Sequence, residues 1–340
     1  MRDRQCHVDN PAEPCRLTNG VLPIICVHAF ETYTLCGDKD HAGASQTHMA
    51  KRMRRLLLAN LALCLSAFAA AAATLDTIAE RGTVRIGYIS GQAPFSSSQP
   101  GAEPVGYAID LCGEIVDEIE HQFPELKRVY VETTLANGFD AVKNEELDLL
   151  CGSITVNLTR REAVDFSQPI FLTGASALLR KDSPGYLQTL FFDGPAVHAV
   201  SERVATNVIG MRANTTTAAT LREALAIQES QTRLADFGTH EDGLKALEDR
   251  KIDAYVADQA LLISLAKRAR DPSSLKVGDR MFTHEPYAIA LRRGDADFRL
   301  LADRALTDFY MSDDFLPLLE SYFGAEAPML HTQIIMQHVP

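Results

Sequence analysis

The stretch of the chain best suited to chemistry is residues 151–171, which read CGSITVNLTRREAVDFSQPIF. Ser153 and Thr155 directly follow the predicted strand LDLLCG, and Arg160 lies in the predicted helix LTRREAV. In open α/β sheets, ligands bind at the carboxyl ends of strands, where unpaired N–H groups of helix starts also attract anions. A guanidinium adds a two-pronged hydrogen bond to a carboxylate. The stretch therefore predicts an anion site, the alternative being an exposed Arg160 and a Thr159 that only caps the helix.

A second group of polar residues repeats this design further along the chain. Thr215 and Thr216 belong to a run of three threonines after the predicted strand NVIGMR, more hydroxyls than one helix cap requires. Asp258 ends the predicted strand IDAYVAD, where an aspartate is either a helix cap or a partner for an ammonium group. Combined with Arg160, these residues would suit a zwitterion that carries a carboxylate and an amine.

Sequence motifs for catalysis are scarce. The chain has no G-x-S-x-G, H-E-x-x-H, G-x-G-x-x-G or P-loop sequence. His240 and Asp258 could form an acid/base pair, but no nucleophile arrangement accompanies them. Cys6, Cys15, Cys26 and Cys36 lack the C-x-x-C spacing of a zinc site. We expect a binding protein and no enzyme, with no cofactor and no metal.

The composition is that of a soluble globular protein, with 46% hydrophobic and 23% charged residues among 340. The formal net charge of -12 argues against nucleic acid as the partner, because binding to phosphates requires clustered Lys and Arg.

The N-terminal part of the sequence predicts export. Residues 49–73 contain a basic start, an apolar run and an alanine-rich cleavage site, the layout of a signal peptide; a membrane-spanning helix is the competing interpretation. Residues 1–48 show no periodicity and are expected to be a non-native or disordered extension. Leu63 before Cys64 disfavours a lipid anchor. In the exported chain only Cys112 and Cys151 remain, and they either pair or stay buried as thiols.

Strand and helix patterns alternate in two similar sets, which predicts two α/β lobes with a ligand cleft between them and two crossover strands. The first set of predicted strands and helices comprises 74–82, 83–89, 105–123, 128–133, 137–146 and 147–152. The second set comprises 207–212, 214–230, 232–238, 240–251, 252–258 and 259–270. The predicted lobe 1 is 74–179 plus 286–324, lobe 2 is 180–285, and the crossovers lie near 178–181 and 284–288. Residues 325–340 form a tail without a clear pattern.

These residues also resemble a known family, the type 2 periplasmic solute-binding proteins of family 3, which deliver amino acids to ABC transporters. Four segments carry the resemblance: VRIGYISGQAPFS, VGYAIDLCGEIVDEI, LDLLCGSITVNLTRREAVDFSQPIF and KIDAYVADQALL. It covers about 74–324.

The resemblance implies a role for each candidate residue. Arg160 would hold the ligand α-carboxylate and Asp258 the α-ammonium. The other implied contacts are Ser153 and Thr155 from lobe 1, Thr215 and Thr216 from lobe 2, and Phe95 from a loop that shapes the side-chain pocket.

Within the family, the sequence is most similar to the glutamate/aspartate-binding branch. His240 falls where that branch has a histidine near the ligand's side-chain carboxylate, whereas Ile89 and Gly138 stand where it has arginines. Burying a carboxylate without a partner is costly, so a polar or neutral amino acid is at least as compatible with these residues as an acidic one.

The sequence thus predicts a periplasmic, monomeric substrate-binding component of an ABC transporter, which binds a polar or acidic amino acid and has a membrane permease as its partner. One alternative is an enzyme on the same fold, similar to cyclohexadienyl or arogenate dehydratases. Another is a sensory input domain, which the sequence after 324 does not favour.

Overall fold

The computed structural model describes residues 73–183, 187–188, 191–192, 207–227 and 232–338. The predicted extension at 1–48 lies outside the described residues, as does the signal peptide except for Ala73. Among the described helices, none is long and apolar enough to cross a membrane.

Lobe 1 is built on a five-stranded sheet with the order β2-β1-β3-β12-β4. Its strands are β1 (Thr83–Tyr88), β2 (Lys127–Glu132), β3 (Leu149–Cys151), β4 (Val164–Phe166) and β12 (Ala290–Arg292). Strand β1 is parallel to β2 and β3, whereas β12 returns from the far end of the chain and runs antiparallel to β3 and β4. The switch in chain order between β1 and β3 opens a crevice at the carboxyl ends of these strands.

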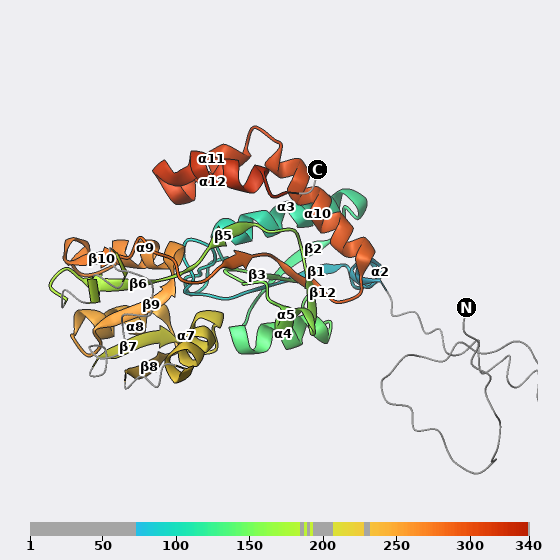
Figure 1. The fold of residues 1–340 in the computed structure, drawn as a ribbon. Helices are drawn as coiled ribbons and strands as arrows, with labels where there is room; N and C mark the ends of the chain where they lie inside the picture. Colours follow the sequence, from blue (N-terminus) through green and yellow to red (C-terminus); the bar gives the residue numbers. More distant parts are fainter. Residues whose placement is uncertain (1–72, 184–186, 189–190, 193–206, 228–231, 339–340) are drawn as a thin grey trace, which may run out of the picture. The chain divides into compact units, whose positions relative to one another are not determined.

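Helices cover both faces of the lobe 1 sheet (Figure 1). The helices of this lobe are α2 (Thr74–Arg81), α3 (Tyr107–Gln122), α4 (Leu135–Lys143), α5 (Leu158–Arg161), α10 (Ala296–Tyr310), α11 (Phe315–Phe323) and α12 (Ala327–Ile335). Helices α3 and α10 pack together on one face, and α4 contacts β3 and β12 from the other.

Lobe 2 repeats this topology with a sheet of order β10-β6-β9-β7-β8. Its strands are β6 (Ala175–Arg180), β7 (Val208–Arg212), β8 (Arg233–Phe237), β9 (Ala254–Asp258) and β10 (Leu275–Val277). Its helices are α7 (Thr216–Ile227), α8 (His240–Glu248) and α9 (Gln259–Lys267). Strand β7 is parallel to β8 and β9, so it takes the place that β1 has in lobe 1. Each lobe therefore presents one switch point.

Two antiparallel strands, β5 (Phe171–Thr173) and β11 (Glu285–Tyr287), join the two sheets. The second crossover strand lies within the predicted range 284–288. The first lies earlier in the chain than the predicted range 178–181. Strand β6 belongs to the lobe 2 sheet, so the chain leaves lobe 1 near Gly174 rather than at 178–181. A Cβ on Gly174 would lie 2.2 Å from the carbonyl oxygen of Thr283, so only glycine fits where the two crossing strands approach.

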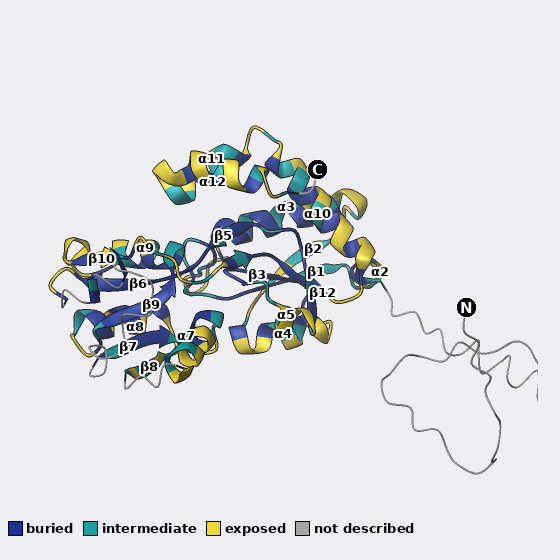
Figure 2. Cartoon of the chain, in the orientation of Figure 1, coloured by how far each residue is buried: buried dark blue, intermediate teal, exposed yellow. Residues whose placement is uncertain are grey.

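The described buried residues form two hydrophobic clusters mainly of lobe 1 and two of lobe 2, and the largest lobe 1 cluster also includes Leu261 of α9. The central strands β3, β6 and β9 are buried throughout, and the exposed residues lie mainly on helices and turns (Figure 2). Cys112 of α3 and Cys151 of β3 are fully buried and form a disulfide, which settles the two alternatives of the sequence. The bond fixes the helix to the strand that precedes Ser153.

The predicted helices and strands are all present, with ends that differ by a few residues. The tail contains a helix that the sequence analysis did not identify, α12, whose buried residues are Ala327, Leu330 and Ile334. This helix packs against the hydrophobic cluster of lobe 1.

Candidate functional site

Polar residues from both switch points line one cavity. Its walls are formed by Gln92, Leu135, Ser153, Thr155, Arg160, Arg212, Thr215, Thr216, Thr217, His240, Val256, Ala257, Asp258 and Leu261. Seven of the eight residues that the sequence singled out are in this set, with Phe95 as the exception. The two parts of the chain that contribute them are far apart in sequence, so the fold itself brings them together.

The lobe 1 half of the cavity forms where β1 and β3 end. The backbone N–H of Ser153 donates to Gln92 Oε1 at 3.2 Å. Gly152 permits this contact, because a Cβ at that position would lie 2.7 Å from the same amide oxygen, and its φ of +151° is unfavourable for other residues. Ser153 and Thr155 are both buried, although they directly follow a strand end.

Arg160 is held in place by several contacts. Its Nη1 donates to the carbonyl oxygen of Thr155 at 2.6 Å, and its guanidinium lies 5.0 Å from the ring centre of Phe139. Burial lowers the pKa of Arg160, while Glu285 and Asp258 counter that effect by attraction. An arginine remains a cation under such shifts, so the cavity contains a partly desolvated positive charge ready for an anion.

The helix start that was expected to assist Arg160 makes a smaller contribution than predicted. Helix α5 is a single turn, and Asn157 Oδ1 accepts the N–H of Arg160 at 2.8 Å. One turn of helix has a weak dipole, and this N–H is already satisfied. The attraction for an anion at this place comes from the guanidinium.

The three threonines of lobe 2 differ in their hydrogen bonds. Thr215 Oγ1 donates to the carbonyl of Arg212 at 3.0 Å and accepts the N–H of Ala218, so this hydroxyl acts as the helix cap. Thr217, which the sequence analysis did not single out as a contact, donates to Asp258 Oδ1 at 2.8 Å. Thr216 Oγ1 donates to Glu285 Oε2 at 2.8 Å.

Asp258 does not cap helix α9 through its side chain, although it occupies the N-cap position. Its carboxylate instead accepts hydrogen bonds from Thr217 and Tyr287. Burial, reinforced by the nearby Glu285, raises the pKa of Asp258 to about 6, while the two hydroxyls and Arg160 favour the ionised form. A carboxylate in this state is suited to receive a cation that restores its lost solvation.

His240 and Arg212 lie at another part of the cavity wall. His240 Nδ1 lies 3.0 Å from the hydroxyl of Tyr255. Burial lowers the pKa of His240 to about 3, with Arg212 and Arg268 contributing further, so the imidazole is neutral at pH 7. Arg212 is the last residue of β7, and burial lowers its pKa as well.

The two lobes contact each other through the same polar groups. Thr155 Oγ1 of lobe 1 lies 3.4 Å from Thr216 Oγ1 of lobe 2, and Tyr287 of the crossover strand reaches Asp258. The free volume of the cavity is about 20 Å³, little more than one water molecule occupies. An organic ligand can therefore enter only when the lobes move apart about the crossover strands.

Phe95 does not line the cavity, which corrects the sequence expectation. It is fully buried in the lobe 1 core, with edge-to-face contacts to Phe171 at 4.9 Å and Tyr287 at 5.1 Å between ring centres. Its place is beneath the site, where it supports Tyr287. Ile89 is also buried in a hydrophobic cluster, and Gly138 packs against Leu150, so neither position contributes to the cavity lining.

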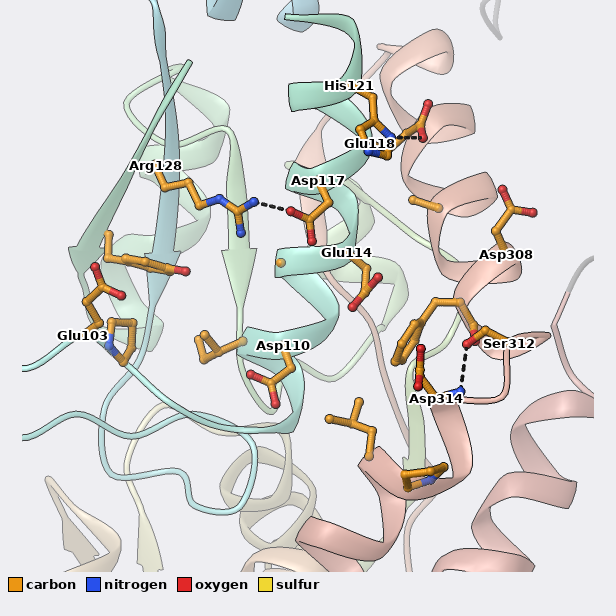
Figure 3. Close-up of a pocket in the computed structure, with 18 residues that line it drawn as sticks. Glu103, Asp110, Glu114, Asp117, Glu118, His121, Arg128, Asp308, Ser312 and Asp314 are labelled. Carbon is orange, nitrogen blue, oxygen red and sulfur yellow. Dashed lines mark hydrogen bonds and ion pairs between the residues drawn. The ribbon is translucent and has the colours of Figure 1, made fainter. Parts of the chain in front are cut away.

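A larger hollow of about 970 Å³ lies over α3, bordered by β2 on one side and by the end of α10 and the start of α11 on the other, away from these residues (Figure 3). Its carboxylates come from Glu103, Asp110, Glu114, Asp117, Glu118, Asp308 and Asp314. Arg128, which also lines it, is already paired with Asp117 and Glu120. This hollow would repel an anionic ligand. Among the described residues, no group of three or more His, Cys, Asp or Glu has the geometry of a metal site.

Five residues in or beside the site are not predicted from the sequence: Gln92, Arg212, Thr217, Glu285 and Tyr287. Arg212 could have been found by the rule that identified Ser153, because it ends a parallel strand next to the switch point. Glu285 and Tyr287 belong to a segment predicted only as a crossover.

Comparison with known proteins identifies the family of the chain. The family model for bacterial extracellular solute-binding proteins, family 3, matches residues 84–325. An L-glutamate/L-aspartate-binding protein of Pseudomonas aeruginosa is 30% identical over 259 residues, which are 75% of this chain and 81% of the relative. The glutamate/aspartate import solute-binding protein of Escherichia coli is 26% identical over 274 residues, 80% of this chain and 86% of the relative.

Solved structures of low sequence identity share the fold. A cysteine-binding protein from Campylobacter jejuni has a TM-score of 0.62 at 22% identity, covering 74% of this chain and 94% of its own. An ancestral amino acid-binding protein described as a precursor of cyclohexadienyl dehydratase has a TM-score of 0.61 at 24% identity, covering 74% and 100%.

Proposed function

The chain belongs to the bacterial extracellular solute-binding proteins of family 3, and from this premise we propose that it captures a polar or acidic α-amino acid between its two lobes. The observation that carries the proposal is the pair of opposite charges in one cavity: the partly desolvated cation of Arg160 and the buried carboxylate of Asp258. An α-amino acid carries one carboxylate and one ammonium on the same carbon, and so it complements both groups at once.

Each charged group of the ligand would replace contacts that the protein now makes with itself. The α-carboxylate would bind the guanidinium of Arg160, assisted by the hydroxyls of Thr155 and Thr216, which lie 3.4 Å apart across the cleft. The α-ammonium would bind Asp258, which Thr217 and Tyr287 already orient. Thr215 would contribute through the backbone, since its hydroxyl is engaged with the carbonyl of Arg212.

Ligand contacts from both lobes connect binding to movement. The open form lets the ligand enter, and the closed form places Arg160 of lobe 1 and Asp258 of lobe 2 around it. A ligand shifts the lobes toward closure only by binding the closed form more tightly, and this arrangement satisfies that condition. We propose that the closed, loaded form is what the membrane permease of an ABC transporter recognises.

The proposed location follows from the predicted signal peptide at 49–73 and from the disulfide between Cys112 and Cys151. Disulfides persist in oxidising compartments such as the bacterial periplasm. Relatives that carry the name of binding or import proteins support the same assignment. We propose a periplasmic protein that binds its ligand without converting it.

A thermal-shift screen of the purified chain against amino acids and small organic acids tests this function. We expect at least one α-amino acid to raise the unfolding temperature in a saturable way, and no product to form. Turnover of prephenate-like or arogenate-like acids would instead support an enzyme similar to cyclohexadienyl dehydratases, and the absence of any stabilising α-amino acid would contradict the proposal.

A further inference from the structure

A groove of about 270 Å³ lies behind the two crossover strands, and we call it the back groove. Its lobe 2 wall is helix α9, with Ile263 and Lys267, and its lobe 1 wall contains Met329 of α12 and Glu326 of the short helix η3 (Gly324–Glu326). Strand β5 forms its floor. Figure 1 shows α11 and α12 on one side of the crossover strands, and α4, α5 and α7, which border the ligand cavity, on the other.

Helix α9 has different faces toward the two hollows. Its residues Ala260, Ile263, Ser264 and Lys267 recur at helical spacing and line the back groove. Leu261 belongs to another face of the helix and lines the ligand cavity. A rotation of lobe 2 that moves Leu261 away from lobe 1 therefore moves the groove face of α9 toward α12.

The two hollows are in opposite states in this structure. The ligand cavity has a free volume of about 20 Å³, whereas the back groove has about 270 Å³. The lobes are connected through β5 and β11, so opening the cleft is a rotation about these strands. Since the cavity and the groove lie on opposite sides of that axis, the rotation that widens the cavity must narrow the groove.

The walls of the back groove carry side chains that would meet when it narrows. Ile263 on one wall is 42% exposed and Met329 on the other is 53% exposed, so both can lose apolar surface on approach. Lys267 and Glu326 are exposed on opposite walls and carry opposite charges, and neither forms an ion pair with a described residue in this closed form. The narrowed groove would therefore gain an apolar contact and an ion pair.

We propose that the back groove closes as the ligand cleft opens, and that the contacts between its walls stabilise the open form. The proposal rests on the ligand capture between two lobes proposed above and adds a means of setting its strength. The apparent affinity for a ligand falls with the fraction of molecules that can close, so groove residues would tune affinity without touching the ligand. Helix α12 lies beyond residues 84–325, which the family model matches.

Removal of the apolar contact should favour the closed form. In the double variant Ile263→Ala/Met329→Ala we expect the amino acid that stabilises the chain most to bind about tenfold more tightly than in the wild type, measured by titration calorimetry. Met311→Ala/Met336→Ala is the matched control, because both side chains are more exposed than Met329 and neither lines the groove. The control should bind as the wild type does. Unchanged or weaker binding in the Ile263/Met329 variant would overturn the proposal.

A charge swap tests the ion pair across the groove. Lys267→Glu places like charges on the two walls, so it should oppose narrowing and tighten ligand binding about threefold. Adding Glu326→Lys restores opposite charges with their places exchanged, and the double variant should return to the wild-type affinity. Tightening that persists in the double variant would contradict contact between the walls.

Distances between the lobes test the groove without a ligand. Spin labels on Lys143→Cys of α4 and Glu223→Cys of α7, with the cysteines outside the disulfide replaced by serine, measure the width of the cleft. We expect a long distance in the otherwise unchanged chain and a shift toward the shorter, closed distance in Ile263→Ala/Met329→Ala. A short distance before that substitution, or no shift after it, would overturn the proposal. If no amino acid binds at all, the proposed function fails, while these distances still decide the role of the groove.

Discussion

The hydroxyl of Tyr287 donates a hydrogen bond to the carboxylate of Asp258, joining a crossover strand to the last residue of a lobe 2 strand. Both side chains are buried. The proposed ammonium partner is therefore fixed by the segment about which the lobes move. The affinity of Asp258 for a ligand would therefore depend on how the two lobes are positioned.

The first prediction is a dependence of affinity on pH. Burial raises the pKa of Asp258 to about 6 in the absence of ligand. A ligand ammonium favours the ionised carboxylate and lowers this pKa, so binding releases a proton at pH values below about 6. Affinity should be constant above about pH 6.5 and fall by up to tenfold per pH unit below about pH 5.5. Titration calorimetry from pH 4.5 to 8 measures it.

Asp258→Asn is the control for that profile and should remove this fall in affinity, although Glu285 and Arg160 remain beside the site. A profile that is flat in the wild type would contradict the account, because Asp258 would then not contact the ligand ammonium.

The second prediction concerns the ammonium group itself. Asp258→Asn removes the charge but keeps the shape, so it should weaken an α-amino acid about 30-fold or more. The matching carboxylate without the amine, such as glutarate in place of glutamate, should lose less than about threefold. Competition binding measures both losses. Equal losses for the two ligands would rule out the role of Asp258.

The third prediction is that Phe95 contributes to the stability of the core and not to ligand binding. Phe95 packs against Phe171 and Tyr287 and does not line the cavity. Phe95→Leu should lower the free energy of unfolding by about 1–3 kcal/mol and change ligand affinity less than about threefold. Urea unfolding and calorimetry give the two numbers. A large loss of affinity without a loss of stability would contradict this prediction and indicate that Phe95 shapes the side-chain pocket.

The fourth prediction concerns the disulfide between Cys112 and Cys151, which closes a segment with a sequence separation of 39. Closing a loop of this length lowers the conformational entropy of the unfolded chain, which stabilises the folded protein by about 2–4 kcal/mol. The double variant Cys112→Ala/Cys151→Ala should lose stability in that range in urea unfolding. A loss under about 1 kcal/mol would indicate that the bond constrains little.

The sequence predicts the two lobes and points to many of the residues that line the cavity, because both predictions depend on local patterns. Ser153, Thr155 and Asp258 follow apolar strands directly, and parallel strands place their carboxyl ends together. The position of a residue in the sequence says less about the direction in which its side chain points. Phe95 lies in a loop rich in Gly, Pro and Ser, where an aromatic side chain can face either a pocket or the core, and packing against Phe171 decides for the core.

The remaining differences arise from contacts distant in sequence. In the run FLTGASALLR, Gly174 is the only residue that interrupts the strand pattern. A single glycine is a weak signal, so the sequence does not show that β5 ends and β6 begins there. The pairing of Cys112 with Cys151 depends on α3 lying against β3. In the sequence, Arg212 is only a polar residue at the end of a predicted strand. The folded structure is needed to show that its Nη1 is buried and makes no hydrogen bond to a described residue.

The central claim is that Arg160 binds the α-carboxylate of an amino acid, and one calorimetric comparison tests it most directly. The wild type, Arg160→Ala and the exposed neighbour Arg161→Ala are titrated with the amino acid that stabilises the chain most. We predict saturable 1:1 binding that falls about 100-fold or more in Arg160→Ala and stays near the wild-type value in Arg161→Ala. Near-wild-type affinity in a folded Arg160→Ala would contradict the claim.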